Sequence, residues 1–102
     1  MPSPAIGILG GTFDPVHMGH LYIASAVLMY LPIQSVRFLP SYLPVHRTSP
    51  LATVEDRIAM LELALKDQPD TVIDLREIER KEPSYMIDTL ISLRNDYPDT
   101  PL

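Results

Sequence analysis

The chain has 102 residues, a formal net charge of −5 and no cysteine. This length allows one domain at most, residues 1–102, and the 46% of hydrophobic residues can fill a core. The absence of cysteine excludes disulfides and thiolate metal sites, and the acidic balance argues against a nucleic-acid-binding surface, which needs a basic stripe. The longest mostly apolar run, residues 21–33, is too short to span a bilayer. With no leader peptide visible, we expect a cytoplasmic globular protein.

The first expected unit is a strand, a glycine turn and a helix. Residues 5–9 form a short apolar run typical of a buried strand, and Gly10 and Gly11 are expected to break it. Asp14 can act as N-cap or close a turn, and Pro15 fits at or near the first position of a helix over 17–31. A strand, a glycine turn and a helix N-terminus offer free backbone N–H groups to an anion, usually a phosphate. A tight turn without a ligand is the alternative for a bare Gly-Gly pair.

Two histidines lie three residues apart at the start of this helix. His17 and His20 are expected to share a helix face and to point toward the anion. They could bind a metal, lie solvated on the surface or contact phosphates. A metal pair is disfavoured because no third ligand of matching type lies close by. Near phosphates, histidine donates charge-assisted hydrogen bonds, while the helix N-terminus opposes imidazole protonation.

The rest of the chain continues the alternation of strands and helices. Thr53 is expected to cap the second helix and Ser84 the third. The first two strands should be parallel, with a right-handed crossover. The expected elements are a strand at 35–40, a helix at 53–66, a strand at 71–75, an extended charged connection at 76–81 and a helix from 84 to about 95.

Apolar residues at helical spacing predict the buried face of each helix. They are Leu21, Ala24, Val27, Leu28 and Leu31 in the first helix, Ile58, Leu61 and Leu65 in the second, and Ile87, Leu90 and Ile91 in the third.

The element order predicts an α/β fold, a Rossmann-like parallel sheet with flanking helices that makes half of a doubly wound domain. Three strands followed by a helix would leave one sheet edge open and one apolar helix face exposed. We therefore expect the chain to be the N-terminal part of a longer protein.

Residues 10–20 read GGTFDPVHMGH. This segment resembles the signature of the nucleotidyltransferase superfamily whose histidine motif is shared with class I aminoacyl-tRNA synthetases. Its wording is similar to that of the nicotinate mononucleotide adenylyltransferase branch. The resemblance implies that His17 and His20 are catalytic and bind ATP phosphates, and that an adenine ring lies over the bare first helical turn. The ATP-binding residues it implies are Gly10, Gly11, Thr12, Phe13, His17, Gly19 and His20.

Two further segments resemble the same branch. Pro44 to Arg47 is similar to its Pro-x-His-basic loop, which implies a phosphate contact from Arg47 and substrate binding by His46. Residues 84–90, SYMIDTL, look like the helix start that holds the pyridine nucleotide, which implies substrate binding by Ser84, Tyr85 and Met86. The alternative is an ordinary capped helix with Tyr85 packed on the core. Glu77 and Arg80 match a Glu-x-x-Arg connection that is expected to fix loop geometry.

The resemblance implies a reaction of ATP with nicotinate mononucleotide that gives nicotinate adenine dinucleotide and pyrophosphate. ATP would bring Mg²⁺, held mostly by phosphates and water, and no metal site of the protein itself is expected. The family's C-terminal serine-rich motif lies outside residues 1–102. The alternative is therefore a non-catalytic nucleotide-binding fragment or assembly module, and a homo-oligomer is compatible with either function.

Overall fold

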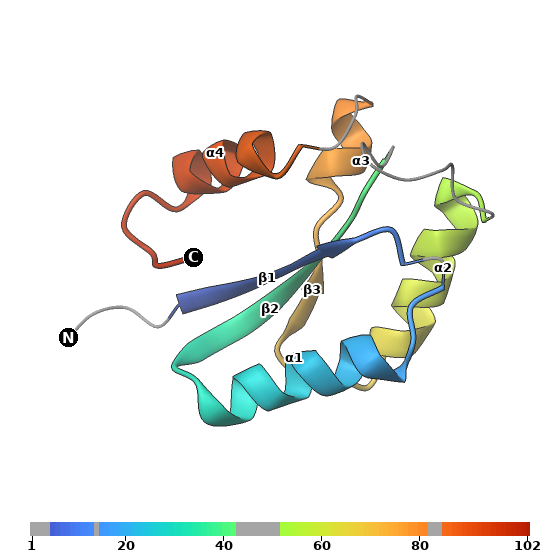
Figure 1. Ribbon diagram of the computed structural model, residues 1–102, viewed down its shortest axis with the longest axis horizontal. Helices are drawn as coiled ribbons and strands as arrows, with labels where there is room; N and C mark the ends of the chain where they lie inside the picture. Colours follow the sequence, from blue (N-terminus) through green and yellow to red (C-terminus); the bar gives the residue numbers. More distant parts are fainter. Residues whose placement is uncertain (1–4, 14, 43–51, 82–84) are drawn as a thin grey trace.

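The computed structural model describes residues 5–13, 15–42, 52–81 and 85–102. Its strands form one parallel sheet in the order β1-β2-β3, flanked by helices, which confirms the predicted fold class (Figure 1). The strands are β1 (Ala5–Gly11), β2 (Ile33–Pro40) and β3 (Thr71–Ile73), and the helices are α1 (Met18–Tyr30), α2 (Val54–Leu65), α3 (Arg76–Arg80) and α4 (Met86–Asp96).

The end of β1 differs from the sequence expectation. Gly10 and Gly11 do not break the strand, because they pair with Leu39 and Pro40 of β2 as its last two residues. No glycine of the chain has a positive φ. The chain instead turns at Phe13, whose backbone is left-handed at φ 52° and whose side chain is buried. This conformation is unfavourable for a bulky residue, and the burial of the ring is what offsets it.

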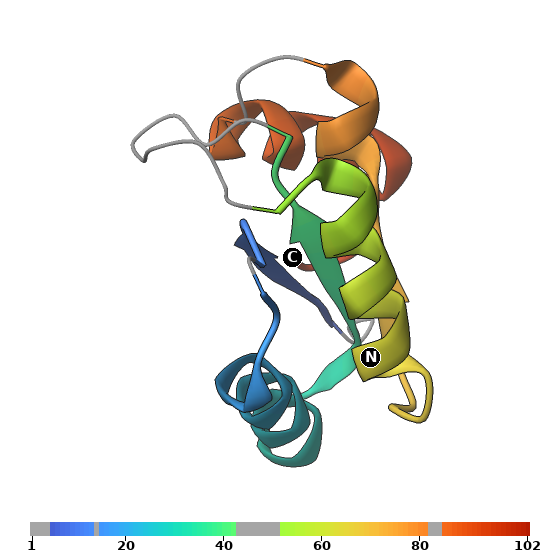
Figure 2. The same ribbon diagram turned by 90° about the vertical axis from the view of Figure 1, so that its right-hand side faces the viewer.

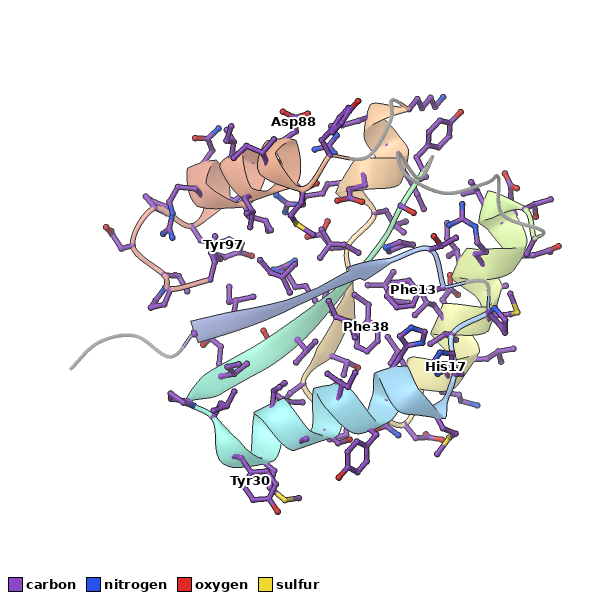
Figure 3. All side chains as sticks on the ribbon, in the orientation of Figure 1. Phe13, His17, Tyr30, Phe38, Asp88 and Tyr97 are labelled. Atoms are coloured by element: carbon purple, nitrogen blue, oxygen red, sulfur yellow. The ribbon has the colours of Figure 1, made fainter. Side chains whose placement is uncertain are left out.

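One hydrophobic core lies between the sheet and the pair α1 and α2. In Figures 1 and 2, α1 and α2 lie on one side of the sheet and α4 lies on the other. Phe13 and Phe38 meet in this core with ring centroids 5.7 Å apart, as Figure 3 shows. The buried members of the core are Phe13, Ala24, Val36, Phe38, Leu61 and Leu65.

The predicted inner faces of α1 and α2 are largely confirmed. Leu21, Ala24, Val27 and Leu28 of α1 all belong to or pack against the core, whereas Leu31 lies beyond the helix at its C-cap and is 53% exposed. In α2, Leu61 and Leu65 are buried as predicted. The first inward position of that helix is taken by Arg57 rather than by Ile58.

The predicted inner face of α4 is wrong. Its apolar residues Ile87, Leu90 and Ile91 are exposed, and the buried residues are Thr89 and Leu93. Polar contacts orient the helix this way: Thr89 donates to the buried carboxylate of Glu77, and Arg76 binds Ser92 and Asp96. An exposed apolar helix face was expected, and α4 supplies it.

Residues 76–80 form the short helix α3 where an extended connection was predicted. The carboxylate of Asp74, which is buried, accepts hydrogen bonds from the backbone N–H and the Nε of Arg76, which starts the helical turn. Lys81 ends it in the left-handed conformation at φ 55°. Within the described residues, no helix is long and apolar enough to cross a membrane.

Candidate functional site

The starts of three helices gather at the carboxyl edge of the sheet. Because each strand is followed by a helix that runs back along the sheet, α1, α2 and α4 all begin near the ends of the strands (Figure 1). In open parallel sheets this edge is where ligands bind. The described residues of the two sequence motifs, 10–13 with 15–20 and 85–90, therefore come to the same edge.

His17 and His20 cap α1 through a reciprocal pair of hydrogen bonds. The backbone N–H of Gly19 donates to Nδ1 of His17 at 3.1 Å, and the backbone N–H of His17 donates to Nδ1 of His20 at 3.1 Å. The two rings stack with centroids 3.9 Å apart and planes inclined by 29°. This is a capping box built from imidazoles, in which two helix-start N–H groups are satisfied by side chains.

The capping bonds determine which ring nitrogen carries the proton. In a neutral imidazole one nitrogen accepts and the other donates. Since both Nδ1 atoms accept from the backbone, both neutral rings carry their proton on Nε2. The helix start therefore presents two Nε2–H donors side by side, an arrangement suited to the oxygens of a phosphate chain.

His17 also explains why the α1 helix begins where it does. Pro15 was expected at or near the first helical position, but it lies before the cap, and the helix starts at Met18. The imidazole of His17 supplies the acceptor that the prediction assigned to Asp14, which lies outside the described residues.

Gly19 leaves space that the His17 ring occupies. A Cβ added at Gly19 would lie 2.8 Å from Cε1 and 3.0 Å from Nδ1 of His17, closer than real Cβ atoms approach. The family resemblance implied that an adenine ring lies over this bare turn. In the structure, the His17 ring lies directly beside it, so the missing Cβ makes space for the capping imidazole.

The ring of His20 packs against Phe13 of the hydrophobic core. Phe13 meets His20 edge-on with ring centroids 4.9 Å apart. Burial lowers the pKa of His20, and the neighbouring charge of His17 lowers it further. His20 is therefore neutral at pH 7 and keeps its accepting Nδ1. The buried Phe13 side chain leaves only its backbone for a nucleotide contact.

The start of α4 meets the end of β1. A Cβ added at Gly10 would lie 3.0 Å from the terminal methyl of Met86, so the missing side chain allows the first residue of α4 to lie against the strand. Tyr85 is the N-cap and is 49% exposed, which contradicts the alternative that it packs on the core. The structure thus brings Gly10 and Met86 together. Gly11 lies beside them and its carbonyl accepts from the backbone N–H of Ser41 at 2.9 Å.

Arg57 was not recognised from the sequence. It is 1% exposed, and its Nη1 donates to the carbonyl of Thr12 at 2.9 Å and to the carbonyl of Ser41 at 2.8 Å. It therefore ties the segment after β1 to the segment after β2. A signal was present in its spacing, because Arg57, Leu61 and Leu65 are four residues apart on the inward stripe of α2, where a charged residue needs buried partners.

Four of the predicted residues, Asp14, His46, Arg47 and Ser84, lie outside the described residues. The pair Glu77 and Arg80 was predicted to fix geometry. Both of these side chains contact the hydroxyl of Thr89, so they join α3 to α4. In the described ranges, no group of three or more His, Cys, Asp or Glu side chains is placed to hold a metal ion.

A family model described as cytidylyltransferase-like matches residues 8–99, which includes every element described above except the first residues of β1. The chain belongs to the cytidylyltransferase-like family. The matched range begins in β1 and contains the capping histidines, Arg57 and the start of α4.

Curated relatives within this family carry the name that the motifs predicted. A protein of Aeromonas hydrophila named probable nicotinate-nucleotide adenylyltransferase is 52% identical over 102 residues, which are 100% of this chain and 48% of the relative. One of Methylococcus capsulatus with the same name is 50% identical over 98 residues, 95% of this chain and 47% of the relative. The chain thus spans about half the length of the curated relatives it matches.

A solved structure shares the fold. The nicotinic acid mononucleotide adenylyltransferase of Plasmodium falciparum, complexed with NaAD, superposes with a TM-score of 0.75 over 94% of this chain and 48% of the other. At 17% sequence identity this likeness shows the fold alone.

Proposed function

We propose that this chain carries the adenylyltransferase function of its relatives, the transfer of AMP from ATP to nicotinate mononucleotide, giving nicotinate adenine dinucleotide and pyrophosphate. The observation that carries the proposal is the stacked pair His17 and His20, whose Nδ1 atoms both accept backbone hydrogen bonds and so leave Nε2 as the donor of each neutral ring. The relatives' names and the edge-of-sheet position support it.

In this reaction a phosphate oxygen of nicotinate mononucleotide attacks the α-phosphorus of ATP in line. A new P–O bond forms, the bond to the β-phosphate oxygen breaks, and pyrophosphate leaves with the bonding electrons. The protein has little covalent work to do, so positioning and charge stabilisation dominate the rate. No side chain of the described residues is needed as a nucleophile.

His17 and His20 would stabilise the charge that moves onto the leaving oxygens. Their Nε2–H donors lie on adjacent, stacked rings, so they can contact neighbouring phosphate oxygens without rearrangement. The N-terminus of α1 adds the positive end of the helix dipole to the same site. Arg47 is proposed as an auxiliary phosphate contact, and Mg²⁺ as part of the ATP substrate.

The start of α4 would bind the second substrate. Among the described residues no side chain caps this helix, so the N–H groups of its first turn are available to an anion such as the nicotinate carboxylate. Asp88 lies on the outer side of α4 in Figure 3, away from the sheet. Ser84, Tyr85, Met86 and His46 remain the proposed substrate-binding residues; of these, Met86 lies against Gly10 in the last part of β1.

A product assay tests this function. The purified chain is incubated with ATP, Mg²⁺ and nicotinate mononucleotide, and nicotinate adenine dinucleotide is measured by mass spectrometry. We expect product from the wild-type chain, a loss of about a hundredfold in rate for His20→Ala because an oxyanion-type donor is removed, and an unchanged rate for the exposed control Leu63→Ala. Equal rates for His20→Ala and wild type would overturn the assigned role.

The second candidate is a nucleotide-binding module without turnover, and the observation that favours it is the half-length match to the relatives. The two functions separate in the same experiment. Binding of ATP that is weakened by His20→Ala, together with no product from either nicotinate or nicotinamide mononucleotide, would assign this chain a binding function only.

A further inference from the structure

The outward side of α1 is apolar and uncharged. Residues 15–36 contain no Asp, Glu, Lys or Arg, although 21% of the whole chain is charged. Met18, Tyr22 and Met29 are 77%, 76% and 72% exposed, and Figure 3 shows Tyr30 directed away from the sheet. A helix that is apolar all round is normally covered on both sides. Here α1 covers the core with one side only.

The exposed residues of α1 repeat with the spacing of a helix–helix seam. Met18, Tyr22, Ser25 and Met29 follow one another at intervals of four, three and four residues, which places them on one stripe. The stripe is symmetric about its midpoint, between residues 23 and 24. In an antiparallel pair of identical helices, Met18 would face Met29 of the second copy. Tyr22 would face the small Ser25, so a large side chain meets a small one at both central positions.

A hollow lies beside this stripe. A cavity of about 310 Å³ opens between α1, the end of α2 and the start of β3. Leu21, Ser25, Leu28 and Met29 form its α1 wall, so the hollow adjoins the central positions of the stripe. Its size suits an aromatic side chain.

We propose that the outer face of α1 is a self-association surface, on which a second copy of this chain packs antiparallel about a twofold axis. Charge is compatible with this occupant, because residues 15–36 carry no Asp, Glu, Lys or Arg that would repel a second copy, and Asp70 is the one acidic residue among the described residues that line the hollow. Exposed apolar surface favours it as well. Met18, Tyr22 and Met29 on the stripe are each more than 70% exposed, and Ile23, Tyr30 and Leu31 outside the stripe are each more than half exposed.

Sedimentation equilibrium tests the proposal on the whole 102-residue chain. We expect twice the 11.5 kDa mass of one chain, and at least about a tenfold weaker dimer for Tyr22→Glu, because a central anchor is replaced by a charge. Ser25→Ala should keep the dimer, whereas Ser25→Arg should abolish it by filling the space of the partner's Tyr22. A monomer at high micromolar concentration would overturn the proposal. This holds even if the chain is monomeric because another of its own segments covers α1.

Matched controls distinguish this surface from the other apolar ones. Leu63→Glu on α2 and Ile87→Glu on α4 introduce the same charge at exposed apolar residues elsewhere, and both should leave the dimer intact. Dissociation by Ile87→Glu, with Tyr22→Glu unaffected, would place the interface on α4 and refute the assignment. All variants are checked for native circular dichroism, and the retained fold in Ser25→Ala and Ile87→Glu keeps the comparison decisive.

The cysteine-free sequence allows the orientation to be tested directly. A mixture of Met18→Cys and Met29→Cys chains should form a mixed disulfide between the two variants, since these positions face each other in the antiparallel pair. Met18→Cys alone should not cross-link with itself. Efficient self-cross-linking of Met18→Cys would show a parallel pair and overturn the antiparallel arrangement.

Discussion

The histidine pair depends on a glycine between its members. A Cβ at Gly19 would lie within 3.0 Å of two atoms of the His17 ring, so Gly19→Ala must displace that ring from its capping bond. In an exposed helix, exchanging glycine for alanine normally stabilises by up to about 1 kcal/mol. Gly19→Ala should therefore stabilise the helix itself but disrupt the position of the His17 ring.

For Gly19→Ala we expect ATP affinity to fall by about tenfold or more, since one hydrogen bond to a charged group contributes about 1.5–3 kcal/mol. Isothermal titration calorimetry measures it, with Ser25→Ala on the same helix as the control. Unchanged ATP affinity in Gly19→Ala would show that the position of the His17 ring does not matter for phosphate binding.

At the scale of elements, one buried side chain joins two strand ends. Arg57 donates from α2 to the carbonyls of Thr12 and Ser41, which follow β1 and β2. Replacing it removes both hydrogen bonds and leaves the two carbonyls without this donor in a buried region. The segments that carry the proposed phosphate contacts would then lose their common support.

We expect Arg57→Met to lower the free energy of unfolding by about 3 kcal/mol, because two hydrogen bonds to a charged group are lost. The exposed control Lys66→Met should change it by less than about 0.5 kcal/mol. Urea denaturation followed by circular dichroism measures both values. Similar stabilities for the two variants would contradict the structural role of Arg57.

Across the whole molecule, the element order predicted the parallel sheet, and hydrophobic spacing predicted most of the inner faces of α1 and α2. It failed for α4, where polar residues decide the orientation: Thr89 and Leu93 turn inward because Glu77 and Arg76 bind this side of the helix. Spacing cannot detect a helix that is oriented by hydrogen bonds to a distant segment. For Arg57, spacing marks an inward position but does not identify its partners, which are carbonyls far along the chain.

The sequence predicted which residues form the candidate site, but not how they are arranged. The motif identified His17, His20 and the glycines, whereas the capping bonds, the stacked rings and the turn at Phe13 follow from three-dimensional packing. Residue spacing placed both imidazoles on one face without showing that the backbone holds their Nδ1 atoms. That detail decides which nitrogen can contact a phosphate.

Acid should disturb this arrangement. The pKa of His20 lies below its ordinary value of 6.5 because burial and His17 disfavour the charged ring. The unfolded chain therefore binds the proton more readily, and the stability that His20 contributes is present above about pH 6.5 and is lost as the pH falls through the lower folded pKa. Protonated Nδ1 can no longer accept the His17 N–H.

The most direct test of the account is the imidazole ¹⁵N NMR spectrum of the 102-residue chain, recorded from pH 7.5 to 5 and with MgATP. We predict that both His17 and His20 carry their proton on Nε2 at pH 7.5, that MgATP shifts both Nε2 signals, and that His20 titrates below pH 6.5. Protonation on Nδ1 in either neutral ring, or Nε2 signals unmoved by saturating MgATP, would contradict a preformed phosphate site at the histidine pair.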